Sequence, residues 1–203
     1  MNIGLIILAA GGSTRLGSPK QLLRYEGQTL IRRAVTAAVE SVCERVVVVI
    51  GSRAADVERE LEGMAVSIVE NPDWEKGMSS SIRAGLTEVL HDETKAVLIM
   101  LCDQPLVTAT VLDNLVETYH KTDMPIVASE YGATRGVPAL FSKELFAELA
   151  ALAGDEGARR VIARYPEMVA TVAFADGVVD IDTRSDYERA VGQDLQDCSG
   201  LTG

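Results

Sequence analysis

Residues 3–20 read IGLIILAAGGSTRLGSPK, and this stretch decides the fold. An apolar run typical of a buried strand opens directly into a glycine-rich loop that carries Arg15 and Lys20. Bare backbone N–H groups in such a loop can hold an anion, because glycine permits close approach and positive φ. Arg15 and Lys20 add a fork of donors and fixed positive charge. The stretch therefore predicts a strand followed by a loop that binds a triphosphate.

The spacing of the glycines excludes two other phosphate-binding motifs. A P-loop needs Gly-x-x-x-x-Gly-Lys-Ser/Thr, and neither Gly11 nor Gly12 begins that motif. The dinucleotide fingerprint Gly-x-Gly-x-x-Gly is not matched either. The remaining alternative is a tight strand-to-helix turn with incidental charges.

Composition favours a single domain with an aliphatic core. The chain has 203 residues, of which 47% are hydrophobic and 4% aromatic, as suits a buried parallel sheet between helices. The net charge of −11 argues against nucleic acid or an anionic membrane as a partner, because such binders carry a basic face. A nucleotide remains compatible with this charge where a local Arg/Lys pocket and magnesium oppose it.

Cysteine usage and targeting signals indicate a cytoplasmic protein. The three cysteines, Cys43, Cys102 and Cys198, form no Cys-x-x-Cys pair, as is typical of a reduced protein. The N-terminal apolar run is short and has no basic region before it, unlike a signal peptide. No stretch has the length of a membrane-spanning helix.

Apolar runs alternate with helical patterns along most of the chain. Strands are expected at residues 3–9, 45–50, 65–69, 96–101 and 125–128. Helices are expected at 29–42, 54–61, 79–90 and 111–120. This alternation predicts right-handed βαβ crossovers and a mostly parallel sheet, with a ligand at the carboxyl ends of its strands.

The pattern changes after residue 130. Shorter elements follow, with strands expected at 137–141, 169–174 and 178–181 and helices at 143–151, 156–164 and 185–191. The polar, glycine-containing end of the chain is expected to fray. The sequence therefore predicts one domain over residues 1–191 and a flexible tail over 192–203.

Asp103 is the main candidate metal ligand. It follows the apolar run at 96–101 and precedes Gln104 and Pro105. A carboxylate at the end of a central strand can project over the phosphate loop, and nucleotidyl transfer needs Mg²⁺ held by carboxylates and substrate phosphates. The alternative is an Asp that caps a helix or turn.

A second acidic segment lies near the C-terminus, where the sequence reads Asp180-Ile181-Asp182-Thr183. Carboxylates two residues apart on a strand face the same side, so Asp180 and Asp182 can both face one metal ion. The alternative is that Asp182 or Thr183 caps the last helix.

Three serines, Ser79, Ser80 and Ser81, stand at the start of an expected helix. Their hydroxyls and the free N–H groups of a helix start can read the edge of a base or hold a ribose. The alternative is a helix cap beside Trp74 as a lone surface residue.

Residues 8–23, LAAGGSTRLGSPKQLL, resemble the signature of the MobA-like nucleotidyltransferases, and within them that of the molybdenum cofactor cytidylyltransferases (MocA type). The resemblance implies a Rossmann-like three-layer α/β/α sandwich of the nucleotide-diphospho-sugar transferase type. The Ala-Ala-Gly form resembles the branch that uses CTP. The loop then wraps the nucleotide, and its implied binding residues are Ala9, Ala10, Gly11, Gly12, Ser13, Arg15 and Lys20.

Other segments match the pattern of this family. Asp103 stands where the family has an Asp-x-Pro motif that holds the metal, and Asp182 matches the second metal contact. The segment that contains the three serines is similar to one that borders the nucleobase. Segments that resemble those on the side of the second substrate contain Gly136, Pro138, Gly154 and Asp155, although Val137 replaces the usual His.

The resemblance implies a Mg²⁺-dependent enzyme that moves CMP from CTP to a phosphorylated acceptor of the molybdopterin type and releases pyrophosphate. Arg15, Lys20 and Asp103 are its implied catalytic residues. A molybdoenzyme of the xanthine dehydrogenase type is the implied protein partner. The alternatives are a sugar or polyol phosphate as the acceptor, GTP as the donor, or an accessory protein that carries the cofactor.

Overall fold

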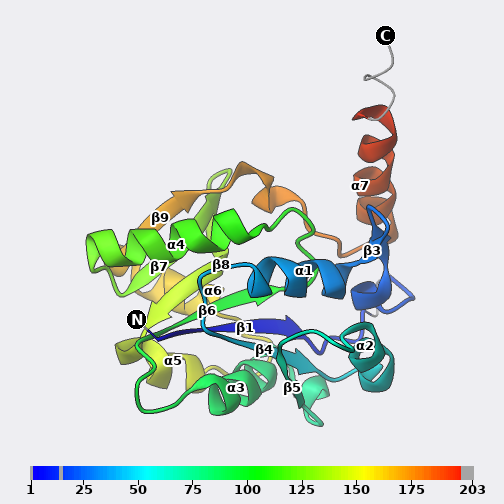
Figure 1. Cartoon of the computed structure of the whole chain (residues 1–203). Helices are drawn as coiled ribbons and strands as arrows, with labels where there is room; N and C mark the ends of the chain where they lie inside the picture. Colours follow the sequence, from blue (N-terminus) through cyan, green and yellow to red (C-terminus); the bar gives the residue numbers. More distant parts are fainter. Residues whose placement is uncertain (1, 14–15, 198–203) are drawn as a thin grey trace.

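The computed structural model describes residues 2–13 and 16–197. Its centre is a seven-stranded sheet in the order β5-β4-β1-β6-β8-β7-β9 (Figure 1). The strands are β1 Ile3–Ala9, β4 Arg45–Ile50, β5 Ser67–Glu70, β6 Ala96–Leu101, β7 Ile126–Tyr131, β8 Thr134–Ser142 and β9 Val169–Ala173. Within this described sheet only β8 runs antiparallel to its neighbours, which confirms the expected mostly parallel sheet.

Helices cover both faces of the sheet and complete three layers (Figure 1). One face carries α1 Leu30–Val39, α2 Ala54–Glu60 and α4 Ala109–Thr122, and the other carries α3 Met78–Val89, α5 Phe146–Ala150 and α6 Arg159–Arg164. Alternate side chains of β1 serve the two faces, since Leu5 and Ile7 belong to one hydrophobic cluster while Ile6 and Leu8 belong to the other. The α/β/α architecture is therefore confirmed.

The central strands occupy the residues that their apolar runs predict. β1, β4 and β6 coincide with the expected strands at 3–9, 45–50 and 96–101. β1 pairs in parallel with both β4 and β6, so the carboxyl ends of the three strands meet at one edge of the sheet. The glycine-rich loop follows β1 at this edge, and Asp103 follows β6.

The prediction of a strand at 178–181 is wrong. Ala175–Val178 form a 3₁₀ helix, and residues 179–182 follow outside the sheet. A Cβ on Gly177 would lie 2.5 Å from the Tyr131 ring, so the chain turns tightly against that ring. Ile181 then anchors the segment, because its side chain is fully buried and its N–H donates to the carbonyl of Asp103 at 3.1 Å.

The final helix α7, Arg184–Asp197, is longer than the helix expected at 185–191. It projects from the body beside the hairpin of β2 Arg24–Tyr25 and β3 Gln28–Thr29 (Figure 1). The part of the expected tail from 192 to 197 is therefore helical, and residues 198–203 lie outside the described part of the chain. Thr183 and Asp186 form a reciprocal cap at the helix start, with N–H to side-chain oxygen distances of 2.8 and 3.2 Å.

Two other helices also differ from expectation. The helix expected at 143–151 is divided into a 3₁₀ turn, Lys143–Leu145, and α5. The helix expected at 156–164 begins only at Arg159.

Candidate active site

The loop after β1 is shaped by close contacts with its surroundings. A Cβ on Gly12 would lie 2.9 Å from the Trp74 ring, so glycine is required there. Ser13 has φ of +51°, and its Oγ accepts a hydrogen bond from the N–H of Lys20 at 3.0 Å. Arg15 lies outside the described residues, so its contact with the phosphates stays a prediction.

Gln21 holds the base of this loop, and the sequence analysis missed it. The side chain is fully buried, and its Nε2 donates to the carbonyls of Ala9 at 2.8 Å and Gly11 at 2.7 Å. A polar residue between Lys20 and two leucines was the signal that could have identified it. The amide fixes the point where the strand becomes the loop.

Three carboxylates converge beside the loop. Asp103 is 4% exposed, and it approaches the more exposed Asp180 and Asp182 so that one carboxylate oxygen of each lies within 4.8 Å of the others. The sequence analysis expected these two carboxylates on a strand, but the irregular segment pinned by Ile181 brings them together instead. Thr183 provides the helix cap, so Asp182 is not needed for it.

Lys20 joins the loop to this carboxylate cluster, which we define as Asp103, Asp180 and Asp182. Its Nζ donates to Asp103 and to Asp182 Oδ1, the latter at 2.9 Å. Burial lowers the pKa of Lys20, but the charge and hydrogen bonds of Asp103 and Asp182 outweigh it, so the net shift is upward. Lys20 is therefore a permanent cation.

Burial and like charges act together on the carboxylates. Burial, followed by the negative charges of Asp103 and Asp182, raises the pKa of Asp180 to about 7. Burial also raises the pKa of Asp103, although the neighbouring Lys20 opposes this shift. The cluster holds more negative charge than Lys20 neutralises, so a further cation would be favourable.

The donor set fits a hard divalent cation. All three donors are carboxylate oxygens, which Mg²⁺ prefers, and Asp103 Oδ1 is buried with no hydrogen-bond partner among the described residues. Opposite ligands of a Mg²⁺ ion lie about 4.2 Å apart, because each ligand distance is about 2.1 Å. Adjacent ligands lie only about 3.0 Å apart, so the three carboxylates, whose oxygens lie within 4.8 Å of one another, would draw together around the ion.

The three serines differ in what they can offer a ligand. The hydroxyls of Ser80 and Ser81 accept hydrogen bonds from Asn71 Nδ2 at 2.9 and 3.0 Å, so they serve the packing of α3. Ser79 Oγ is buried and has no partner among the described residues, while its N–H donates to the Gly154 carbonyl at 3.1 Å. Asn71 is a further residue that the sequence analysis missed.

The residues expected on the acceptor side lie in turns and packing contacts near the site. A Cβ on Gly77 would lie 2.4 Å from the carbonyl of Gly154, so the turn before α3 and the turn before α6 are in contact. Gly136 is buried under the Tyr131 hydroxyl, and the carbonyl of Pro138 accepts from Ser129 Oγ at 2.7 Å. Asp155 is exposed beside Gly154.

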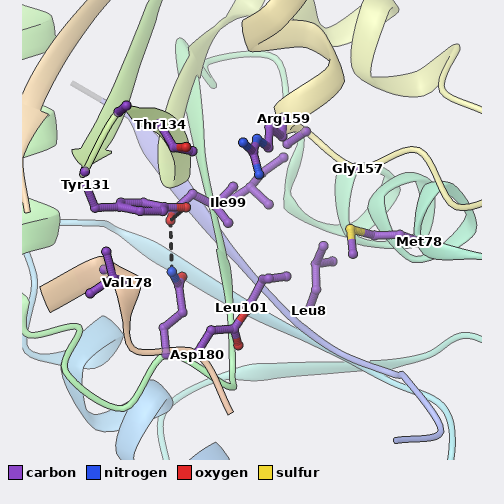
Figure 2. Close-up of a pocket in the computed structure, with 16 residues that line it drawn as sticks. Leu8, Met78, Ile99, Leu101, Tyr131, Thr134, Gly157, Arg159, Val178 and Asp180 are labelled. Carbon is purple, nitrogen blue, oxygen red and sulfur yellow. Dashed lines mark hydrogen bonds between the residues drawn. The ribbon is translucent and has the colours of Figure 1, made fainter. Parts of the chain in front are cut away.

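A cavity of about 600 Å³ lies next to the carboxylate cluster. Its lining includes Val137, Gly157 and Arg159, which are close in sequence to the residues expected on the acceptor side. Its wall is mostly apolar and includes Leu8, Ile99 and Leu101. Figure 2 shows Val178 and Met78 on opposite sides of the cavity, Arg159 at one edge and Asp180 at another. Asp180 thus belongs both to the carboxylate cluster and to the cavity wall.

Gln104 connects Asp103 to the cavity wall and was also missed as a site residue. It lines the cavity, and its Nε2 donates to the carbonyl of Val137 at 3.1 Å. The hydroxyl of Tyr131 donates to the same carbonyl at 3.3 Å. Gln104 Oε1 is buried and lacks a hydrogen-bond partner among the residues described.

The fold and this edge of the sheet define an α/β protein that places a glycine-rich loop beside clustered carboxylates. Residues 5–169 match the model of the MobA-like NTP transferase domain, and the chain belongs to this family. It is accordingly an enzyme of the nucleotidyltransferase type, as the resemblance implies.

Two curated relatives carry different names. The chain is 32% identical to nicotine blue oxidoreductase of Paenarthrobacter nicotinovorans, over 88% of this chain and 91% of that protein. It is 26% identical to molybdenum cofactor cytidylyltransferase of Escherichia coli (strain K12), over 91% of this chain and 93% of that protein. Both relatives match the chain over most of its length.

Solved structures agree on the fold. A homologue of Mycobacterium tuberculosis Rv0371c from Mycobacterium sp. strain JC1 superposes with a TM-score of 0.85 at 32% identity, covering 96% of this chain and 97% of that one. Rv0371c of M. tuberculosis H37Rv in complex with manganese gives 0.74 at 29%, covering 95% and 99%. Structures at 12% and 16% identity share the fold alone and confirm the nucleotide-diphospho-sugar transferase type. Nucleotidyltransferases of this family use a divalent metal, as the manganese complex illustrates.

The described residues contain no helix that is long and apolar enough to cross a membrane.

Proposed function

We propose that this chain transfers CMP from CTP to a phosphorylated, ring-bearing acceptor of the molybdopterin type, with Mg²⁺ as the cofactor. One observation carries the proposal: the carboxylate cluster lies between the phosphate loop and the cavity. Lys20 links the cluster to the loop, and Asp180 links it to the cavity wall. This is where the reacting phosphates of two substrates would meet.

The proposed reaction is a single in-line transfer. A terminal phosphate oxygen of the acceptor forms a bond to the α-phosphorus of CTP, the bond from that phosphorus to the oxygen bridging to the β-phosphate breaks, and pyrophosphate leaves with the electron pair. Residues 9–13 and Arg15 would hold the triphosphate, and Lys20 would donate to its oxygens. Asp103, Asp180 and Asp182 would hold the cation, which when bound supplies positive charge against the phosphates.

CTP is the proposed donor because of the loop and one relative. Ala9-Ala10-Gly11 is the form that resembles the CTP-using branch, and one curated relative is named a cytidylyltransferase. Ser79, with a buried hydroxyl that lacks a partner among the described residues, is the serine we assign to the base or ribose. GTP as the donor is the alternative that the assay below separates.

The apolar cavity supports a ring-bearing acceptor over a sugar or polyol phosphate. Leu8, Ile99 and Leu101 offer no hydrogen bonds to hydroxyl groups, and the polar lining is confined to a few groups such as Gln104 Oε1 and Arg159. Each hydroxyl buried against the apolar side chains without a partner costs roughly 1–3 kcal/mol, so a polyol would bind less well than a flat ring with a few polar edge atoms. Gly136 and Pro138 flank the lining residue Val137, and Gly154 and Asp155 precede the lining residue Gly157. These four residues would therefore shape the acceptor side through their neighbours.

A second candidate is an oxidoreductase, because the relative named nicotine blue oxidoreductase is 32% identical over 88% of the chain. An apolar cavity suits an aromatic substrate in either reaction. The carboxylate cluster favours transfer, since three carboxylates beside bound phosphates repel them unless a cation intervenes.

We place this activity in the cytoplasm, with a molybdoenzyme of the xanthine dehydrogenase type as the protein that receives the product. An accessory protein that carries the cofactor without turnover is the alternative. The set of Lys20 and the carboxylate cluster supports an active enzyme over a carrier.

The test is pyrophosphate release with Mg²⁺ and purified molybdenum cofactor, run in parallel with CTP and with GTP. The proposal expects release with CTP that requires both the metal and the cofactor. Release with a simple sugar phosphate but none with the cofactor would replace the acceptor. Oxidation of NADH or NADPH in the presence of an aromatic substrate, without pyrophosphate release, would establish the oxidoreductase instead.

A further inference from the structure

We propose that Lys20 holds the position of the divalent cation in the nucleotide-free enzyme and gives it up when a triphosphate arrives to receive its ammonium group. The enzyme would then take up its metal together with the nucleotide and bind free metal weakly. This inference rests on the proposed metal-dependent function and concerns the order in which the site is filled.

Lys20 and a divalent cation would share the same ligands. Lys20 Nζ donates to Asp103 and to Asp182, and both belong to the carboxylate cluster that fits a metal ion. One oxygen of each carboxylate lies within 4.8 Å of the others, which leaves room for one cation among them. An ammonium group and a divalent cation cannot occupy that place together, because both are positive and both need the same oxygens.

Only the side chain of Lys20 has to move for this exchange. The N–H of Lys20 donates to Ser13 Oγ, and the adjacent Gln21 is fixed to the carbonyls of Ala9 and Gly11. The backbone of Lys20 is thus tied to the loop, and the exchange needs only a rotation of its side chain. That side chain is 18% exposed, so it has access to the loop where the triphosphate would lie.

A bound triphosphate would supply Lys20 with new partners. The ammonium group of Lys20 is mostly buried between the carboxylates of Asp103 and Asp182, so it must keep an anionic partner wherever it moves. Without a nucleotide, leaving the carboxylates would strand the ammonium group. A triphosphate offers replacement oxygens, so metal and nucleotide binding should reinforce each other by the same factor in either order.

Mn²⁺ binding to the purified protein, followed by the electron paramagnetic resonance of free Mn²⁺, tests the exchange without turnover. The wild-type protein should bind Mn²⁺ more tightly with an unreactive CTP analogue than without it, by a factor in the range of about 5–150. The Lys20→Met variant should bind Mn²⁺ without nucleotide more tightly than wild type, by roughly tenfold, and should lose most of the coupling.

The matched control is Lys121→Met, which removes an exposed lysine on α4 that pairs with Glu117. It should bind Mn²⁺ as wild type does. Equal or weaker Mn²⁺ binding by Lys20→Met than by wild type would overturn the exchange, provided that circular dichroism shows the same fold. If that variant does not fold, the wild-type protein still provides a test. A Mn²⁺ affinity that does not change when the CTP analogue is added would by itself overturn the proposed exchange. The proposed function fails separately, if no nucleotide yields pyrophosphate while the Mn²⁺ exchange is still observed.

Discussion

Replacing Asp103 by Asn should remove activity while leaving the fold intact. The substitution keeps the size of the side chain and removes one negative charge from the carboxylate cluster. The lost attraction between Asp103 and the cation–phosphate centre is taken as that of two unit charges about 4 Å apart. This amounts to about 4 kcal/mol at an effective dielectric constant of about 20. Each 1.36 kcal/mol corresponds to a factor of ten, so the transfer rate should fall by roughly a thousandfold.

The expected effect on stability is small because two contributions oppose each other. Asp103→Asn loses the ion pair with Lys20, but it also removes a buried charge and relieves the repulsion of Asp103 by Asp180 and Asp182. The free energy of unfolding should therefore change by only about 1 kcal/mol.

The assay is pyrophosphate release at saturating Mg²⁺ and CTP, paired with urea unfolding of the same preparation. A fall in rate without a fall in stability is the expected pattern. A rate within tenfold of wild type would refute the assignment of Asp103 to the metal. A loss of several kcal/mol in unfolding would show that the residue is needed for the fold instead.

Three further predictions follow from the site and its supports. The pKa of Asp180 is raised from 3.8 to about 7, so protonated Asp180 stabilises the metal-free protein fully below pH 4. This stabilisation is lost as the pH rises to 7, so the melting temperature of the wild-type protein should fall over this range, and it should fall less in Asp180→Asn. Gly77→Ala should lower the free energy of unfolding by about 2 kcal/mol more than Gly63→Ala, because both glycines have positive φ but only the Cβ at Gly77 meets the backbone of Gly154; equal losses by chemical denaturation would contradict this. Val137→Phe narrows the cavity and should raise the KM of the acceptor roughly tenfold without changing the KM of CTP; an unchanged acceptor KM would place the acceptor elsewhere.

The strands of the centre were predictable because their residues are apolar on both faces. β1, β4 and β6 are almost entirely buried and consist mostly of Val, Ile, Leu and Ala, and such runs can be recognised directly in the sequence. The strand expected at 178–181 failed because two valines and an isoleucine imitate a strand. Val178 is 64% exposed, and the buried Ile181 serves as an anchor for a segment outside the sheet.

The charged residues and glycines of the candidate site could be predicted from the sequence. The residues whose role depends on how they pack in the folded protein could not. Lys20, Asp103 and Asp182 follow from motif and strand ends, and the structure brings them together. Gln21 was not predictable as the clamp of the loop, because its role depends on burial against two carbonyls far from it in the chain. Ser80 shows the reverse case, since its hydroxyl serves Asn71 rather than facing the site.

The central claim is that the carboxylate cluster holds a metal ion against a triphosphate on the loop after β1. The most direct measurement is the anomalous scattering of Mn²⁺ in crystals grown with an unreactive CTP analogue. The account predicts one strong peak bounded by Asp103, Asp180 and Asp182 and by phosphate oxygens, with the triphosphate lying along residues 10–13. A peak away from these carboxylates, or a nucleotide bound away from the loop, would contradict it.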